Sequence, residues 1–235
     1  MARNIQTELS MIANLLQRRN VCKDVTPILR AIPKIGRNGS GPCKIEKLEI
    51  TLPKPANMRP NNIIRLVAII TVETDGKHVN EADIDHMFNN YLFNVIFMGY
   101  GQGKEEYYYS SIHLDYESSN SSGYIHPCFH LTYGGLGVKN IDHGQLMVLP
   151  VPRIPIWPMD FILGLDFILS NFLNKEEYKG LIADSYYRSA LRKSQDSIWR
   201  PYILAVAHHW CKFTNCKYNM IDNALSLNYI PTLIQ

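Results

Sequence analysis

Long apolar runs are missing from this sequence. No stretch approaches the roughly 18 consecutive apolar residues that a membrane-spanning helix needs. The first residues, MARNIQTELSMIANLL, have no continuous apolar segment and carry Glu8, which is not the pattern of a signal peptide. The sequence therefore predicts a cytoplasmic protein that makes no contact with a membrane.

Disulfide spacing and familiar catalytic signatures are missing as well. The five cysteines are an odd number without a disulfide-like spacing, which predicts free thiols. The sequence has no G-x-x-x-x-G-K-[ST], G-x-S-x-G or H-E-x-x-H motif, so it lacks the signatures of P-loop, serine-hydrolase and zinc-protease sites. We expect the protein to need no cofactor.

Charge is scarce and unevenly placed. Charged residues make up 19% of the 235-residue chain and hydrophobic residues 46%, which suits a domain with a substantial core. Residues 1–65 hold 12 Lys and Arg against 4 Asp and Glu, whereas the remainder holds 12 against 17. A basic N-terminal third is typical of a surface that contacts nucleic acid or an acidic partner, although a solvated face and loop would carry the same charges. The candidate contacts there are Arg18, Arg19, Lys34, Arg37, Lys44 and Lys47.

Hydrophobic periodicity predicts a helix followed by strands in the N-terminal half. Residues 4–19 carry apolar side chains at helical spacing, and the Gly- and Pro-rich segment that follows, 31–44, predicts a loop or arm. Residues 44–52 and 63–74 are rich in β-branched side chains and predict strands, the second of them central. Residues 80–97 begin with an Asn cap and acidic residues and predict a helix, which could continue as a strand near Phe93.

The rest of the chain predicts a hairpin and then helices. Two strands, 107–117 and 124–133, flank the polar loop SSNSSG and predict a β-hairpin. The proline-rich segment 146–158 can hardly be an inner strand or a helix, so it predicts an extended crossing segment, and its Trp157 is a candidate contact for a partner. Helices are predicted at 158–173, which is apolar nearly all round, and at 176–193 and 196–213.

This order of elements predicts an α+β fold in a single domain spanning 1–235. We expect a basic N-terminal amphipathic helix and arm within 1–65. An antiparallel sheet with a β-hairpin should occupy 44–150. A helical half, 158–235, should pack on that sheet.

Histidines are concentrated in the predicted hairpin. Strand period 2 places His126, Cys128, His130 and Thr132 of the stretch HPCFHLTYGG on one face, while the apolar residues between them enter the core. In the partner strand, His113 and Asp115 share a face. If the apolar faces of the two strands match, all six side chains lie on a single surface, and such a surface suits proton transfer or metal binding.

One interpretation of this surface is catalytic. The His130-Leu-Thr132 triplet is similar to the His-x-Thr motif of two-histidine phosphodiesterases, in which the histidine moves a proton and the hydroxyl holds a phosphate. The partner triplet begins at His113 but ends in Asp115, and it lies closer in sequence than that family requires. A metal-independent phosphodiesterase or nuclease would use His113, His126, His130 and Thr132 as catalytic residues.

Metal binding and a purely structural role are the other interpretations. The Cα atoms of His126 and His130 should lie about 13 Å apart in a straight strand, too far to share one ion unless Pro127 bends it. The cluster HHWCKFTNC lacks a zinc-finger spacing. We therefore expect no metal site, and we expect the histidines to lie covered rather than in an open cleft. Asp166 lies among apolar residues and should need hydrogen-bond donors, for which Arg153 is the candidate.

Three stretches carry a family resemblance. HPCFHLTYGG, PRIPIWPMDFILGLDFILSNFL and SQDSIWRPYILAVAHHW together resemble a bacterial family known only as a domain of unknown function, over roughly residues 107–210. Members of that family lie near phage-defence and restriction genes, so the resemblance implies a role in defence but no activity. We expect an accessory, non-catalytic subunit of a prokaryotic antiviral defence assembly that contacts a partner protein, nucleic acid or both.

Overall fold

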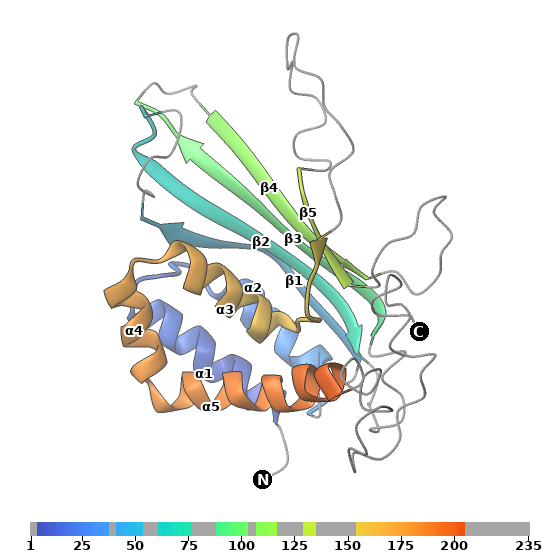
Figure 1. The fold of residues 1–235 in the computed structure, drawn as a ribbon. Coiled ribbons are helices and arrows are strands. Elements are labelled where there is room, and N and C mark those ends of the chain that lie inside the picture. Colours follow the sequence, from blue (N-terminus) through green and yellow to red (C-terminus); the bar gives the residue numbers. More distant parts are fainter. Residues whose placement is uncertain are drawn as a thin grey trace, which may run out of the picture.

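The computed structural model describes residues 4–37, 41–53, 61–76, 88–102, 107–116, 129–134 and 154–204. These residues form one antiparallel sheet and five α-helices, and the helices all lie on one face of the sheet (Figure 1). The predicted α+β class is confirmed, with an N-terminal helix, a hairpin within the sheet and helices in the C-terminal half.

Helix α1 (Ile5–Arg18) forms where the apolar spacing predicts it. The side-chain oxygen of Asn4 caps the helix by accepting a hydrogen bond from the backbone N–H of Thr7 at 3.2 Å. Leu9, Ile12 and Leu16 form the predicted stripe and are fully buried in the core. Each of these side chains contributes about 2 kcal/mol to stability through burial, so the apolar face holds the helix in place.

The predicted arm is packed against the helix it follows. Helix α2 (Thr26–Ala31), which was not predicted, ends where the predicted arm begins, and a short 3₁₀ turn (Ile32–Lys34) occupies the first part of the arm. The Gln6 side chain donates a hydrogen bond to the carbonyl of Ile35 at 2.7 Å, and the Ile5 N–H donates to the carbonyl of Arg37 at 2.9 Å. The segment up to Arg37 is therefore part of the folded body, because α1 satisfies its backbone carbonyls.

The sheet is a meander in which each strand pairs antiparallel with the next, in the order β1 to β6. The predicted strands at 44–52, 63–74 and 107–117 are confirmed, and β4 and β5 pair as the predicted hairpin partners. The strands are β1 (Gly41–Leu52), β2 (Arg65–Gly76), β3 (Phe88–Tyr100), β4 (Tyr107–Tyr116), β5 (Phe129–Tyr133) and β6 (Ile154–Pro155).

A β-bulge explains the imperfect alternation of the first strand. The pairing of β1 with β2 shifts between Ile45 and Leu48, and Lys47 there has a positive φ of 53°. The extra residue restores the inward direction, so that Ile45, Leu48 and Ile50 are all buried. Charged residues and a bulge on this first strand of the sheet also discourage pairing with another chain.

The helix predicted from residue 80 is wrong for residues 88–92, and the strand expected near Phe93 is present but begins earlier, at Phe88. Residues from Phe88 onward form β3, which lies between β2 and β4. Tyr91, Phe93, Val95 and Phe97 alternate with more exposed residues and are buried against the helices. The cap and acidic residues that favoured a helix, 80–87, lie outside the described residues. Period-2 burial between two partner strands therefore decides the conformation of the described part.

The C-terminal helices begin at side-chain caps, which are Asp160, Asn174 and Asp184 in chain order. Helix α3 (Phe161–Phe172) is buried as predicted, and the Asp160 side chain accepts a hydrogen bond from the Leu163 N–H at 2.9 Å. The predicted helix at 176–193 is two helices, α4 (Lys175–Ala183) and α5 (Ser185–Ser194), because Asp184 lies between them in an extended conformation and caps the second. A π-helical turn (Gln195–Trp199) follows. Of the predicted helix at 196–213, the structure describes the part that ends at residue 204.

The two faces of the sheet differ in composition. In β2, Leu66, Ala68, Ile70 and Val72 point toward the helices and are buried. The alternate residues of the inner strands lie on the opposite face, which includes polar side chains such as Thr71. Within the described residues, no helix is long and apolar enough to cross a membrane.

Candidate functional site

The predicted histidine surface forms between β4 and β5. The strand register places His113 directly opposite Thr132 and Asp115 directly opposite His130. All four side chains lie on the face of the sheet away from the helices, because their apolar neighbours in the two strands are buried in the core. His126 and Cys128, the remaining members of the predicted set, lie outside the described residues.

One carboxylate oxygen connects the two histidines. His113 Nε2 lies 3.0 Å and His130 Nε2 lies 3.6 Å from the same Oδ2 atom of Asp115. The side chain of His130 is 4% exposed, and that of His113 is 23% exposed. Asp115 therefore joins two adjacent strands through their histidines, in line with the expectation that His130 is covered.

This geometry limits what the cluster can do as a catalyst. In a two-histidine phosphodiesterase, each imidazole must present a nitrogen to the substrate, one as base and the other as acid. Here the Nε2 atoms of both His113 and His130 face Asp115, and the second ring is almost fully buried. The contacts favour a structural role in which the carboxylate orients both rings and stabilises the pairing of β4 and β5.

The end of β5 is closed by a glycine. Gly134 has a φ of +88°, which favours glycine, and its N–H donates a hydrogen bond to the Ser111 carbonyl at 2.8 Å. The Ser111 hydroxyl donates to the carbonyl of Gly134 in return. The first glycine after HPCFHLTY thus ends the strand and needs no role in ligand binding.

No metal site is visible in the part of the chain that the structure describes. Within those ranges no three His, Cys, Asp or Glu side chains are placed to hold an ion. Cys22 and Cys43 are buried free thiols, and burial raises the pKa of the Cys22 thiol to about 11 and of the Cys43 thiol to about 12. Both thiols therefore stay protonated and are poor ligands and nucleophiles. The cluster HHWCKFTNC lies outside the described residues.

The candidate basic residues lie in three separate places. Arg18 and Arg19 are exposed at the C-terminal end of α1, about 20 Å along the helix from its first turn. Arg37 is bonded to that first turn and lies near Lys34. Lys44 belongs to β1, where it forms ion pairs with Glu46 at 3.1 Å and Glu73 at 3.8 Å. The exposed Lys47 sits at the bulge of the same strand. The six side chains thus belong to different elements, namely the end of α1, the segment after α2 and strand β1.

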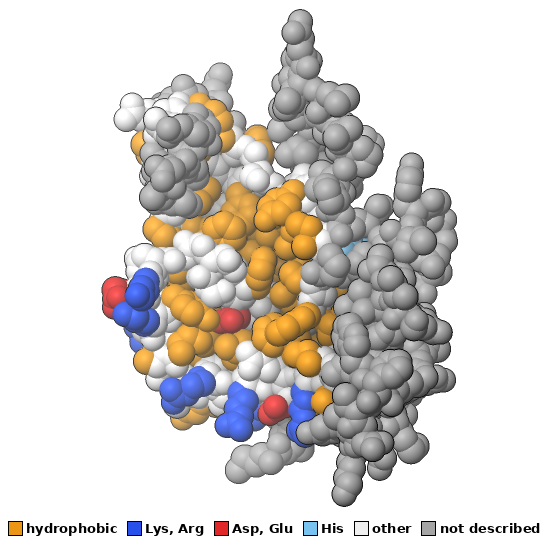
Figure 2. Space-filling model, in the orientation of Figure 1, with side chains coloured by type: hydrophobic (Ala, Val, Ile, Leu, Met, Phe, Trp, Pro, Cys, Tyr) orange, Lys and Arg blue, Asp and Glu red, His pale blue; other side chains and the backbone are white. Residues whose placement is uncertain are grey.

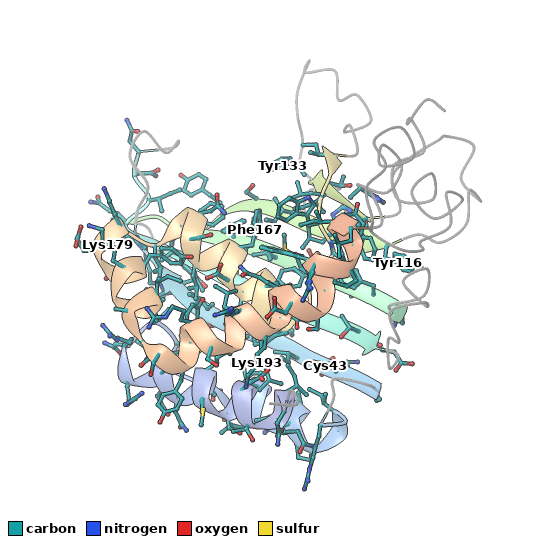
Figure 3. The ribbon with its side chains drawn as sticks, turned by 60° about the horizontal axis from the view of Figure 1, so that its bottom comes forward. Cys43, Tyr116, Tyr133, Phe167, Lys179 and Lys193 are labelled. Atoms are coloured by element: carbon teal, nitrogen blue, oxygen red, sulfur yellow. The ribbon has the colours of Figure 1, made fainter. Side chains whose placement is uncertain are left out.

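An apolar surface lies at the β6 edge of the sheet. Tyr133 of β5 is 55% exposed, Ile154 of β6 is 47% exposed and Trp157 is 49% exposed. Ile154 is paired opposite Leu131, so it points to the same side as Tyr133 two residues further along. We call these three residues the β6 edge surface. Figure 3 shows Tyr133 at this edge and Phe167 of α3 on the same side of the sheet, and Figure 2 shows hydrophobic side chains gathered over this region.

Trp157 is held in position by a second tryptophan. The rings of Trp157 and Trp199 meet edge to face, with centroids 5.1 Å apart. The indole N–H of Trp199 donates a hydrogen bond to the Pro158 carbonyl at 2.8 Å. An exposed ring fixed in this way loses little freedom when it is covered by another molecule.

Asp166 finds tyrosine donors. The hydroxyls of Tyr187 and Tyr178 donate hydrogen bonds to its Oδ1 atom at 2.9 Å and 3.1 Å, so α4 and α5 satisfy a carboxylate of α3. Burial raises the pKa of Asp166, and the two hydroxyl donors oppose that rise. Arg153, the predicted partner, lies outside the described residues. The tyrosines could not be identified beforehand because no local spacing links them to Asp166.

Comparisons with protein-family models, with curated proteins and with solved structures found no match.

Proposed function

We propose that this protein is an accessory, non-catalytic subunit of a prokaryotic antiviral defence assembly in the cytoplasm, and that it binds a partner protein through the β6 edge surface. The observation that carries the binding proposal is the presence of three large apolar side chains, each about half exposed, along one edge of the sheet. The defence setting is supported by the resemblance of HPCFHLTYGG and the two later stretches to the bacterial family of unknown function that lies near phage-defence genes.

The three side chains of the β6 edge surface leave apolar area exposed to solvent. Single exposed apolar residues are ordinary, whereas neighbouring ones are typical of an interface. Tryptophan and tyrosine are enriched among the residues that contribute most to protein binding. Trp157 is also fixed by Trp199 before any partner arrives, so its ordering costs little on binding. A partner with an apolar segment that covers this edge fits these features best.

The proposal predicts that Trp157→Ala weakens partner binding by about 30-fold, which is the loss of a residue that contributes about 2 kcal/mol. The tagged full-length chain would first be purified with its partner from its source cells. Titration calorimetry on the two purified proteins would then compare variants. Ile64→Ala is the control, because Ile64 is 64% exposed just before β2 and should leave the affinity unchanged. A partner that binds both variants equally, or the absence of any partner, would contradict the proposal.

A second candidate function is a metal-independent phosphodiesterase or nuclease. One observation favours it, namely that the register brings His113, Asp115, His130 and Thr132 together on one face. It ranks second because both Nε2 atoms face Asp115 and His130 is 4% exposed. The first function gives His130 a structural role, whereas the second gives it a catalytic role.

If the cluster is structural, His130→Ala should lower the unfolding free energy by about 1–3 kcal/mol, because buried hydrogen-bonding groups lose their partner. The same substitution should then leave the turnover of the tested substrates unchanged. Thermal unfolding and cleavage of labelled RNA, DNA and cyclic nucleotides in EDTA would be measured in parallel. Wild-type turnover that disappears in folded His113→Ala and His130→Ala proteins would support the second candidate instead.

A further inference from the structure

A groove separates the exposed sides of α1 and α5. Its volume is about 460 Å³, within the usual range of ligand-binding pockets. The two helices lie side by side on the outer layer of the fold (Figure 1). The groove is lined by Met11, Asn14, Gln17, Arg18, Asp184 and Tyr186.

Contacts at both ends hold the helices that form the groove. Toward the N-terminal end of α1, Lys193 of α5 forms an ion pair with Glu8 at 3.3 Å. Toward the C-terminal end, the Arg19 guanidinium donates a hydrogen bond to the Gly180 carbonyl of α4 at 3.1 Å. The two helices run antiparallel between these contacts, so the lining residues come from the second half of α1 and the start of α5. Helix α1 is therefore fixed at both ends of the groove, to α5 at one end and to α4 at the other.

The groove is lined by an aromatic ring and by polar side chains that can donate or accept hydrogen bonds. Tyr186 is 60% exposed, which leaves its ring free for stacking. Asn14 and Gln17 carry amides that both donate and accept hydrogen bonds. The Oδ1 atom of Asp184 accepts hydrogen bonds from the backbone N–H groups of Tyr186 and Tyr187 at the start of α5. These bonds do not use the Oδ2 atom. A flat ligand with its own donors and acceptors along one edge matches this set.

The helices around the groove are rich in arginine. Arg18 lines it, Arg19 follows at the end of α1, and Arg188 and Arg192 are exposed one and two turns into α5. Asp184 is the single carboxylate among the lining residues. Figure 2 shows Lys and Arg side chains, with one acidic stretch of surface between them, along the lower border of the described part of the molecule, where Figure 1 places α4 and α5. An anion that crosses α5 would meet these cations.

We propose that this groove binds a base of a single-stranded nucleic acid, stacked on Tyr186, while the arginines contact the flanking phosphates. Amides of Asn and Gln suit base edges, and aromatic rings provide stacking platforms for unpaired bases. The proposal deepens the proposed function, on which it rests, by naming the nucleic acid that such a subunit would hold and the surface that holds it. The α1–α5 surface thereby keeps Arg18 and Arg19 from the candidate basic residues of the N-terminal third and adds Arg188 and Arg192 of α5.

Other anionic partners fit the groove less well. The carboxylate of Asp184 would repel the side chains of an acidic peptide, whereas it can accept a hydrogen bond from the amino group of a base. Bases of an intact duplex stay stacked inside the helix and cannot enter a groove of this kind. A single strand exposes both its bases and its phosphates. It can therefore contact the tyrosine, the amides and the arginines of this surface together.

Fluorescence anisotropy of the full-length protein with labelled single-stranded DNA and RNA would test the proposal. Oligonucleotides of about 12 nucleotides match common site sizes, and titrations at about 50 and 200 mM salt would reveal phosphate contacts. Tyr186→Ala should weaken binding by about tenfold, the loss of one stacked base, whereas Tyr186→Phe should retain it. Arg18→Ala should reduce the salt dependence by about one counterion.

A matched control and two competitors make the result decisive. Tyr109→Ala removes another exposed tyrosine, 47% exposed on β4, and should bind like the wild type. Double-stranded DNA and polyglutamate should compete poorly. Absence of binding, indifference to Tyr186→Ala or effective competition by polyglutamate would overturn the inference. Partner binding that still depends on Trp157 would show that the proposed function survives that failure.

Discussion

Gly164→Ala is expected to destabilise the protein by about 3 kcal/mol, at the upper end of the cost of overpacking a core. A Cβ atom at this position of α3 would overlap Cε2 and Cζ of Phe93 and would lie 2.8 Å from its Cδ2. The Phe93 ring on β3 is 1% exposed and is packed on all sides, so it cannot move away without opening a void. The glycine lets the helix backbone approach the sheet closely.

Chemical and thermal unfolding followed by circular dichroism would measure this cost. Gly180→Ala in α4 is the matched control, because a Cβ there meets only the flexible end of Arg19, with Nη1 at 2.8 Å. The helix propensity of alanine offsets that contact by up to about 1 kcal/mol, so the control should unfold close to the wild type. The double variant Gly164→Ala, Phe93→Leu should be more stable than Gly164→Ala alone. Equal stability of the two alanine variants would refute the close-approach argument.

Lys193→Ala is expected to cost about 2–4 kcal/mol, because it leaves the Glu8 carboxylate buried without its cation. The Glu8 side chain is 6% exposed and lies 3.3 Å from the ammonium group of Lys193. The cost should fall short of that for a fully buried pair, because the Lys193 side chain is 37% exposed and water reaches it. Figure 3 shows Lys193 where α5 faces α1.

The surface pair formed by Lys179 and Glu176 provides the comparison. Its atoms are 2.9 Å apart, closer than in the buried pair, yet the side chains are 57% and 79% exposed. Lys179→Ala should therefore cost about 0.5 kcal/mol or less. Replacing both Glu8 and Lys193 by Met should recover most of the stability lost in Lys193→Ala. If Lys193→Ala and Lys179→Ala lower the free energy of unfolding in urea by the same amount, the burial of Glu8 does not determine the cost of losing its cation.

Both variants also bear on the proposed surfaces. The close contact at Gly164 seats α3 on the sheet, and the segment before α3 carries Trp157. The pair of Glu8 and Lys193 joins α1 to α5 on either side of the groove that contains Tyr186. Loss of binding in these two variants would follow from displaced helices, so the binding tests use substitutions of exposed side chains instead.

Part of the histidine surface could be predicted from the sequence. The alternation in the two strands was enough to place His113 with Asp115 and His130 with Thr132 on one face, and the register confirms it. The distances to a single carboxylate oxygen and the burial of His130 could not be predicted. They depend on which residues face each other across the strands and on what covers them.

The errors have physical causes as well. The break at Asp184 was missed because helical spacing continues on both sides of it, while an acidic cap can start a new helix at any point. Strand β3 was mistaken for a helix because its preceding residues resemble a helix start, whereas burial between two strands decides its conformation.

The sequence by itself determined the α+β class, the amphipathic helix α1, most of the strands and the buried character of α3, because hydrophobic period is a local property of the chain. Only the tertiary structure decided which distant side chains meet. Asp166 lies beside Tyr178 and Tyr187, Glu8 beside Lys193, and Arg18 shares a groove with Tyr186. These contacts join residues up to about 185 positions apart, and they arise from the way α3, α4 and α5 pack with α1 on one face of the sheet, which no local pattern encodes.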